Sequence, residues 1–408
     1  MTSRARELAA IAPDYDGAHV RHVMTSAAAS LGLKGFPERL GLPSASITVV
    51  LMVDGLGDEL IARHTGHARF LGSVWRRGST AKVLDATAPA TTAASISSLG
   101  TGEVPGRHGL VGYDVLAPWL DRVVNMLGGW DSAVDPSRWQ PHESVLARTE
   151  RAGARMLTVS RPKFADSQLT RAVLAGGEFI GANRMDSRFR LAAEAISAHR
   201  PGGGSVRQGA PTPMLMYLYV DELDKTGHRH GVNSAEWVRA LETLDREAEK
   251  FTTQLARRFG DQLSVVLTAD HGMLDVAPEH RLDFSGDQEL LRGVRHTAGE
   301  PRFLHLHFDP EATMAVRRQV HEAWEERFGD QAWICTRDEA IDAGWFGTVE
   351  GGVRARIGDL LVAVHGPIAL YDTARTGPDP LQMVGQHGSL TVEELRVPLL
   401  SLTGRPFS

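Results

Sequence analysis

Carboxylate and imidazole side chains recur in four short, glycine-containing segments of the chain. They are Asp54 in MVDGLG, Asp224 and His228 in DKTGH, Asp270 and His271 in TADHG, and His387 in GQHGS. Alone, such an Asp is usually a turn former and such a His is usually a loop residue. Together, three Asp and three His beside glycines that permit close backbone approach are a ligand inventory for two metal ions. Mixed imidazole and carboxylate ligands favour Zn²⁺ and leave Mn²⁺ as an alternative.

A candidate nucleophile lies between these segments in the sequence. Two such ions about 3.5 to 4 Å apart can clamp the attacking and leaving oxygens of a phosphoryl transfer. In TAPATTAASISS, Pro89 ends an extended stretch, and Thr91 and Thr92 begin a predicted helix that is rich in small residues. The partial positive charge of the helix N-terminus and a bound metal would both stabilise an alkoxide formed from a hydroxyl at that point. Either threonine alone is more often a helix N-cap, so the residues by themselves leave the nucleophile open.

Apolar runs that end in a carboxylate are the elements expected to position these groups. The runs are Ser46 to Asp54, Pro213 to Asp221 and Leu263 to Asp270, with further strand candidates at Ala81 to Ala86, Arg155 to Ser160 and Asp359 to Val364. Near-continuous apolarity is typical of strands buried on both faces of a parallel sheet. A long amphipathic helix is predicted from an N-cap at Ser234 to a stop at Gly260. We therefore expect a layered α/β core with a largely parallel sheet, with the ligands at the carboxyl ends of its strands.

Two regions interrupt the alternation of strand and helix. Residues 118–204 are loop-rich and end in a glycine linker at Gly202 to Gly204, which predicts a cap inserted into the core. Residues 278–352 have the pattern strand, helix, strand and predict a small α+β lobe before the last ligand segment. We expect one catalytic domain over residues 1–408 that contains both regions.

Composition and charge restrict the partners. The chain has 408 residues and a net charge of −6 from 44 basic and 50 acidic residues, which disfavours a nucleic-acid polymer. Its longest apolar run, Ile47 to Val53, is far below the roughly 18 to 20 residues that cross a bilayer, which disfavours a membrane partner. The only cysteine, Cys335, cannot form an internal disulfide, and the N-terminal stretch has no apolar secretory segment. A cytoplasmic location and a small phosphate-ester substrate are the predictions, and the oligomeric state stays open.

In their order, these motifs resemble those of the type I phosphodiesterase and nucleotide pyrophosphatase/phosphodiesterase branch of the alkaline phosphatase superfamily. The matching motifs are MVDGLGDE, P-x-x-T at Pro89 to Thr92, Thr101-Gly102, P-x-x-HG at Pro105 to Gly109, D-x-x-x-H at Asp224 to His228, ADHG at Ala269 to Gly272, and His387-Gly388. They cover about Ser46 to Leu402. The resemblance implies an alkaline phosphatase-like three-layer sandwich.

The resemblance also implies roles for individual residues. It assigns one metal to Asp224, His228 and His387 and the other to Asp54, Asp270 and His271. It makes Thr92 the nucleophile on the second metal, because the spacing to the Thr-Gly pair fits when it is counted from Thr92. His108 is implied to be structural. The implied reaction is hydrolysis of a phosphodiester or pyrophosphate bond through a phosphothreonine intermediate.

Two positions depart from the family pattern and bear on the substrate. Where nucleotide pyrophosphatases carry Asn, this chain has Ser95 and Tyr113. A tyrosine hydroxyl can still donate to a phosphoryl oxygen, so Tyr113 is the predicted substrate-binding residue, and nucleotide specificity does not transfer automatically. Phosphonate hydrolase, phosphomonoesterase and phosphomutase activities would use the same metal site and stay as alternatives. A non-enzymatic metal-binding protein is disfavoured, because the nucleophile and all six ligand positions are filled.

Overall fold

A seven-stranded sheet forms the centre of the computed structural model, which describes residues 3–199 and 212–408. In spatial order its strands are β2 (Ala81–Asp85), β17 (Arg396–Ser401), β8 (Leu263–Thr268), β1 (Ile47–Val53), β7 (Met214–Val220), β5 (Arg155–Ser160) and β6 (Glu178–Gly181). The contacts from β8 through β6 are parallel, and only β17 runs antiparallel to its neighbours. The predicted largely parallel sheet is confirmed.

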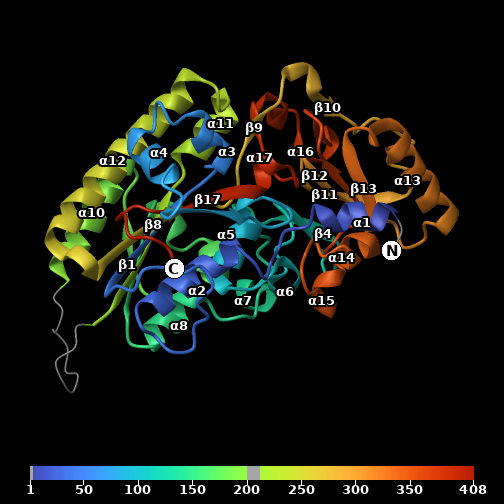
Figure 1. Cartoon of the computed structure of the whole chain (residues 1–408). Coiled ribbons are helices and arrows are strands. Elements are labelled where there is room, and N and C mark those ends of the chain that lie inside the picture. Colours follow the sequence, from blue (N-terminus) through green and yellow to red (C-terminus); the bar gives the residue numbers. More distant parts are fainter. Residues whose placement is uncertain (1–2, 200–211) are drawn as a thin grey trace.

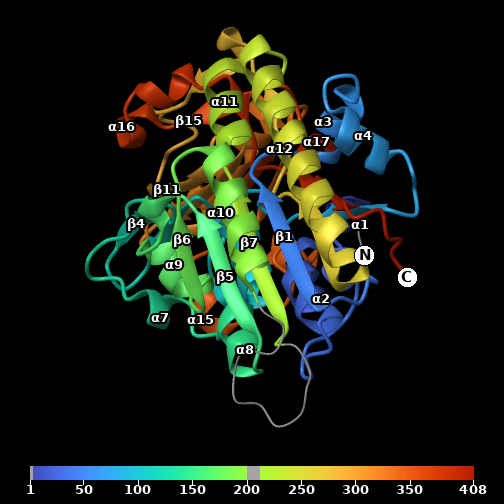
Figure 2. The same cartoon turned by 90° about the vertical axis from the view of Figure 1, so that its left-hand side faces the viewer.

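The three central strands are β1, β7 and β8, and every residue in them is buried. Both faces of the sheet are covered, which is why these strands are predominantly apolar rather than alternately apolar and polar. Helices α10 (Met185–Ala198) and α12 (Ala235–Phe259) pack on one face, and α2 (Val23–Ser30) and α8 (Val145–Arg151) pack on the other. Figure 2 shows α10 and α12 running along the strands on the side that faces the viewer.

Helix α12 follows the sequence prediction closely. The Ser234 side chain caps its first turn by accepting from the Trp237 backbone N–H, and Gly260 ends it with φ 51°. Its buried stripe includes Trp237, Leu241 and Phe251, at the spacing that places side chains on one helix face. With α10 and α12 on one face of the sheet and α2 and α8 on the other, the core has three layers.

A second, four-stranded antiparallel sheet forms a lobe at one end of the molecule, shown in orange in Figure 1. Its order is β11 (Val294–Glu300), β12 (Phe303–Phe308), β14 (Leu360–Val364) and β13 (Ala332–Thr336), covered by α13 (Met314–Phe328) and α14 (Arg337–Asp342). The lobe has a core of its own around the buried Trp324. The limit predicted at residue 352 is too early, because β14 pairs between β12 and β13 and belongs to the lobe rather than to the central sheet.

The cap predicted over residues 118–204 is wrong in its bounds. Strands β5 and β6 belong to the main sheet, and α10 packs against β5 and β7, so much of this region is core. Because the loops here are long relative to the helices and strands, the sequence does not show that β5, a short helix and β6 form one strand, helix and strand unit. Outside the sheet lie a hairpin of β3 (Asp114–Ala117) and β4 (Arg122–Asn125) and the short helices α7 (Pro136–Trp139) and α9 (Gln168–Val173). The predicted linker at Gly202 to Gly204 lies outside the described residues.

Short elements complete the architecture. They are the helices α1 (Ser3–Ala10), α3 (Asp58–Arg63), α4 (Arg69–Trp75), α6 (Pro105–His108), α15 (Gly351–Arg354), α16 (Thr373–Thr376) and α17 (Val392–Leu395), and the strands β9 (Leu274–Asp275), β10 (Arg281–Asp283), β15 (Ala369–Tyr371) and β16 (Gly385–Gln386). Within residues 3–199 and 212–408, no helix has the length and apolarity needed to span a bilayer.

Candidate active site

The carboxyl ends of three adjacent parallel strands bring most of the predicted ligands together. Asp54 follows β1, Asp270 and His271 follow β8, and α11 (Glu222–His230), which follows β7, contains Asp224 and His228. Gly55, at φ 74°, makes this approach feasible, since a Cβ there would lie 3.2 Å from the Asp224 Cα. The site is therefore built at the edge where parallel strands present their ligands.

Thr92 is the first residue of α5 (Thr92–Thr101) and faces these groups. Its Oγ1 lies 3.0 Å from Nε2 of His271 and donates a hydrogen bond to Oδ1 of Asp54 at 3.5 Å. Thr91 is the N-cap residue, and its buried hydroxyl has no hydrogen-bond partner among the described residues. Thr92, rather than Thr91, thus lies beside the ligand candidates.

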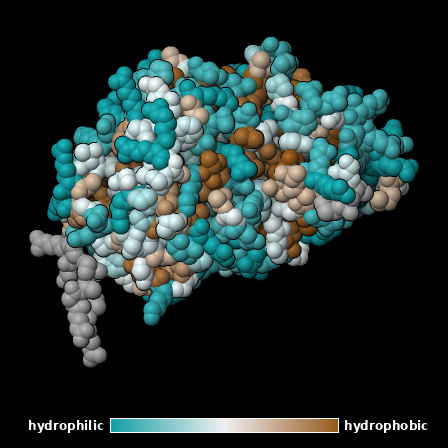
Figure 3. All heavy atoms as spheres, viewed as in Figure 1, coloured by the Kyte–Doolittle hydropathy of each residue, from teal (hydrophilic) through white to brown (hydrophobic). Residues whose placement is uncertain are grey.

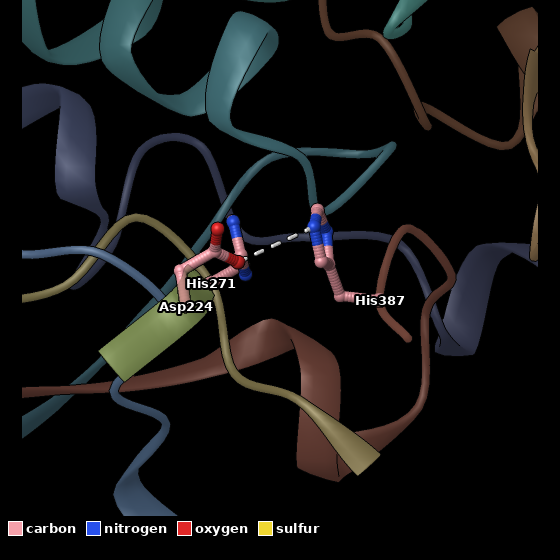
Figure 4. A group of neighbouring side chains, drawn as sticks. All are labelled: Asp224, His271 and His387. Carbon is pink, nitrogen blue, oxygen red and sulfur yellow. Dashed lines mark ion pairs between the residues drawn. The ribbon is translucent and has the colours of Figure 1, made fainter. Parts of the chain in front are cut away.

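His387 reaches the same site from the segment after β16. Its ring stacks on that of His271 with centroids 3.6 Å apart, and the His228 ring lies 5.2 Å away. Its Nε2 is 3.9 Å from Oδ1 of Asp224, the contact that the dashed line marks in Figure 4. The same Asp224 oxygen is 3.1 Å from Nε2 of His228.

Two overlapping sets of side chains have ligand atoms within 4.8 Å of one another. One set is Asp54, Asp270 and His271, and the other is Asp224, His271 and His387. The first equals a set implied by the family resemblance. The second contains His271 where the resemblance implies His228, although His228 remains in contact with Asp224. All six candidates therefore lie in one site, and their division between two ions stays a prediction.

Backbone carbonyls orient the three histidines. The Nδ1 atoms lie 2.8 Å from Gly385 O for His228, 2.9 Å from Gly272 O for His271 and 3.0 Å from Ala90 O for His387. With Nδ1–H donating to a carbonyl, Nε2 carries the lone pair that a metal requires. Each ring therefore presents Nε2 to the site, which suits it to bind a metal.

The carboxylates fit a cation in the same way. Oδ1 of Asp224 and Oδ2 of Asp270 are buried without a hydrogen-bond partner in the described part of the chain. Burial, together with the nearby Asp224 and Asp270 charges, raises the pKa of Asp54 well above its usual value. Divalent cations would offset this accumulation of negative charge, so the residues present fit a two-metal centre.

Two cavities open from the site on either side of Tyr113 and Leu127, which line both. The first is about 340 Å³ and includes Thr92 and the aromatic rings of Phe164, Phe179 and Tyr219. The second is about 320 Å³, and residues of the lobe such as Glu300 and Leu304 line it. Asp224, His228 and His387 line both. Groups attached to two sides of a central phosphorus could therefore be accommodated.

Tyr113, the predicted substrate-binding residue, lies at this junction with 39% of its surface exposed. Burial of the hydroxyl raises its pKa, and a hydrogen bond with the Asn125 side chain opposes that rise. Asn125 lines the first cavity and also donates to Asp114 at 2.9 Å. Sequence reasoning overlooked Asn125, because it lies in a hairpin 12 residues beyond Tyr113 where no motif marks it.

Of three further residues near the site, one contacts a ligand candidate and two are engaged elsewhere. Tyr219 donates to Oδ2 of Asp54 from within β7, a contact that an apolar strand pattern does not reveal. Asp221 pairs with Arg161 and Lys225, so it is engaged away from the metal site. His108 is fully buried and its Nε2 lies 3.0 Å from the Ser98 hydroxyl, apart from the ligand cluster.

Comparison with families and curated proteins gives consistent matches. A family model described as type I phosphodiesterase / nucleotide pyrophosphatase matches residues 48–390. Venom phosphodiesterase 2 of Crotalus adamanteus is 34% identical over 76 residues, which are 18% of this chain and 9% of that protein. Human ectonucleotide pyrophosphatase/phosphodiesterase family member 7 is 38% identical over 63 residues, which are 15% of this chain and 14% of that protein. The aligned segments thus span only a small part of these curated relatives.

Solved structures show the likeness of fold over most of the chain. Murine ectonucleotide pyrophosphatase/phosphodiesterase 5 aligns with a TM-score of 0.64 and 14% identity, covering 87% of each chain. An inactive form of that murine protein in complex with AMP aligns with a TM-score of 0.63 and 14% identity, again over 87% of each chain. The sheet and its helices therefore adopt the alkaline phosphatase-like fold.

Proposed function

The chain belongs to the type I phosphodiesterase / nucleotide pyrophosphatase family, and on that premise we propose that it hydrolyses a phosphodiester or pyrophosphate bond in a small phosphate ester. The observation that supports this most is the position of the Thr92 hydroxyl, 3.0 Å from His271 and beside Asp54, at the first turn of a helix. A nucleophile, three imidazoles and three carboxylates meet there.

Six side chains would hold the metals: Asp224, His228 and His387 one ion, and Asp54, Asp270 and His271 the other. Two bound divalent ions, Zn²⁺ by ligand type with Mn²⁺ as the alternative, would supply Lewis acidity to the phosphoryl and leaving oxygens.

Thr92 is the group that reacts. Its Oγ1 attacks phosphorus, the bond from phosphorus to the leaving alcohol oxygen breaks, and phosphothreonine forms. Thr92 loses its hydroxyl proton in this step and the leaving oxygen gains one through solvent, because Oδ1 of Asp54 and Nε2 of His271, the atoms nearest to the hydroxyl, would both hold a metal. The α5 N-terminus stabilises negative charge that develops at this point. Water then attacks phosphorus, the bond to Thr92 Oγ1 breaks, and the threonine is restored.

The two cavities favour a diester over a monoester. A monoester needs room for one organic group, whereas this site has space on both sides of Tyr113. The first cavity is mostly apolar, with Phe164 and Phe179 available to contact a flat ring, and Lys163 lines it as well. A nucleoside 5′-monophosphoryl group suits such a cavity, and the AMP bound to the murine structural neighbour points the same way.

A substrate panel tests the proposal. The protein is stripped with a chelator, reloaded with Zn²⁺ or Mn²⁺, and assayed with bis(4-nitrophenyl) phosphate, 4-nitrophenyl phosphate and the 4-nitrophenyl ester of AMP. We expect metal-dependent turnover with higher kcat/KM for the diesters. Equal or faster turnover of the monoester would favour a phosphomonoesterase, and a lack of turnover on all three would refute the proposal.

A further inference from the structure

One wall of the first cavity carries more positive than negative charge. Four basic side chains gather there, from the loop after β5, from α10 and from α11: Arg161, Lys163, Arg188 and Lys225. The carboxylates of Asp221 and Glu222 face them. We call these six residues the cationic wall. Lys163 and Lys225 line the cavity itself, together with Thr92.

Ion pairs hold three of the four cations. The Arg188 side chain is 0% exposed and donates to both carboxylate oxygens of Glu222, at 2.6 and 2.5 Å. Arg161 donates to Asp221 at 2.6 Å and to Glu222 at 3.1 Å. Lys225 donates to the other oxygen of Asp221, which is 2% exposed. Three cations therefore share two carboxylates, and one positive charge is left over.

Lys163 adds a second positive charge without a counter-charge. Its side chain makes no ion pair and no hydrogen bond within residues 3–199 and 212–408. Its Nζ lies 4.8 Å from the centre of the Phe164 ring, and Nζ of Lys225 lies 5.9 Å from the same centre. Asp166, the acidic residue nearest to Lys163 in the sequence, is exposed and lines neither cavity. The surplus charge of the wall thus lies around one aromatic ring of the cavity.

A short series of contacts connects this ring to the ligand cluster. Phe164 packs edge-on against Tyr219, with ring centroids 5.9 Å apart. The Tyr219 hydroxyl donates to Asp54, which also accepts from the Thr92 hydroxyl. A ring-bearing phosphate ester bound at Thr92 can therefore extend along Phe164 toward the two lysines.

The remainder of the cavity lining makes an anionic group the best complement to this wall. Much of it is apolar, including Ile96, Leu169, Leu174 and Phe179. Apolar surface excludes water that would otherwise screen the lysine charges, so a charged ligand group interacts with them more strongly here than in bulk solvent. A negative charge on the ligand would neutralise part of the surplus, whereas a neutral group would leave it.

The next inference rests on the proposed function and extends it to the class of substrate. We propose that the protein selects a phosphate ester in which one organic group is a flat ring carrying a second anionic group, a carboxylate or a phosphoryl group, and that Lys163 binds this second group. The ring contacts Phe164 and Phe179, and the phosphoryl group that reacts lies at Thr92. Lys163 is a specificity residue in this account, because it contacts the substrate and takes no part in bond breaking.

Arylphosphonates test the site by binding alone, because the proposed reaction leaves their carbon–phosphorus bond intact. Phenylphosphonates with a para carboxylate, a para phosphonate or a neutral para carboxamide have one ring each, so the ring can occupy whichever cavity fits it. We expect calorimetric titration of the zinc-loaded protein to give a Kd on the order of fivefold lower or more for an anionic substituent than for the carboxamide, with a smaller ratio at high salt.

A second set of ligands, with two methylene groups between ring and substituent, extends the reach. The preference for an anion should appear in at least one set, and the anion with the lower Kd identifies the preferred group.

Variants at position 163 identify the side chain that is responsible. Lys163→Gln removes the charge and should remove most of the preference, whereas Lys163→Arg keeps the charge and should keep the preference. Lys34→Gln is the control, because it removes the charge of another exposed lysine that lines neither cavity, and it should leave the ratio of Kd values unchanged. All three substitutions are at exposed positions, where effects on stability are usually small.

The outcomes separate this inference from the proposed function. Equal Kd values for anionic and neutral substituents in both sets would overturn the anion site, and hydrolysis of bis(4-nitrophenyl) phosphate by the same preparation would leave the function intact. A preference that persists unchanged in Lys163→Gln would overturn the role of Lys163. Failure of every phosphonate to bind to a preparation that hydrolyses the diester would also overturn the anion site. Absence of both binding and turnover would refute the proposed function, and the anion site with it.

Discussion

At the scale of single residues, the account depends on which of two adjacent threonines reacts. Thr92 Oγ1 lies within hydrogen-bonding distance of His271, whereas the Thr91 hydroxyl is buried without a partner and its residue is the N-cap of α5. The helical register turns these two side chains in different directions, and a shift of one residue would move the nucleophile away from the ligand cluster.

Thr92→Ala should therefore abolish diester hydrolysis, with a loss on the order of 10³-fold or more in kcat, because the covalent step has no nucleophile. Bound metal, measured by elemental analysis, and the thermal midpoint should change little. Thr91→Ala is the matched control and should keep most of its turnover. Loss of activity in Thr91→Ala together with activity in Thr92→Ala would reverse the assignment.

Tyr113 is the second residue whose role can be isolated. If its hydroxyl donates to a phosphoryl oxygen as charge develops, Tyr113→Phe should lower kcat by about 10²-fold with little change in KM, because the ring and its packing are preserved. Steady-state kinetics on bis(4-nitrophenyl) phosphate measure both constants. Unchanged kinetics would show that the donor lies elsewhere, with Asn125 on the same cavity wall as the next candidate.

At the scale of elements, a buried ion pair joins the lobe to the segment that carries His387. Arg302, just before β12, and Glu394, in α17, are both 0% exposed, and Nε donates to Oε1 at 2.7 Å. Glu394 Oε1 also accepts from the Ser389 N–H at 2.9 Å, two residues after His387. The pair thus fixes the position of a predicted ligand.

Glu394→Gln should destabilise the protein by about 3 to 5 kcal/mol, because it leaves the Arg302 guanidinium buried without a counter-charge. Chemical denaturation measures the free energy of unfolding. Glu393→Gln, one residue earlier and 42% exposed, is the control, with an expected change within about 0.5 kcal/mol. Similar effects of the two substitutions would contradict the structural role of the pair.

His108, at the end of α6, gives a prediction for acid stability. Burial, followed by the nearby charges of His142 and Arg356, lowers its pKa from 6.5 to about 3. The unfolded chain therefore binds more protons between those values, so stability is complete above pH 6.5 and declines as the pH falls toward 3. At pH 5 this one group accounts for a loss of about 2 kcal/mol.

Urea titrations at pH 7 and pH 5 test that decline. In His108→Gln, which retains a polar nitrogen for the Ser98 hydroxyl but does not titrate, the fall in unfolding free energy should be about 2 kcal/mol smaller than in the wild type. An equal fall in both proteins would mean that other buried groups, such as His305, account for the acid sensitivity.

Elements differ in how well the sequence predicts them. Strands buried on both faces, such as β1 and β8, are recognisable because nearly all of their residues are apolar or β-branched and a predicted ligand follows. Strand β6 (Glu178–Gly181) is short and lacks a buried residue, so nothing in its pattern distinguishes it from a loop. The bounds of the predicted cap were wrong for that reason. Long-range contacts, such as Glu300 with Tyr113, depend on pairing of distant segments that local patterns do not encode.

At the scale of the whole molecule, the site lies where the central sheet and the lobe meet. The face seen in Figure 3 is largely hydrophilic with separate hydrophobic patches, and the net charge of −6 agrees with a small substrate better than with a nucleic-acid polymer. The lobe contributes Leu304 and Glu300 to the wall of the second cavity, which Asp224, His228 and His387 also line. The cytoplasmic location stays a prediction.

The stereochemical course at phosphorus tests the central claim most directly, because covalent catalysis by Thr92 requires two in-line displacements. The substrate is a 4-nitrophenyl ester of AMP made chiral by one sulfur at phosphorus, hydrolysed by the metal-loaded protein in ¹⁸O-labelled water. Each displacement inverts the configuration, so the account predicts net retention in the product. Net inversion would show a single direct attack by water and would contradict a phosphothreonine intermediate.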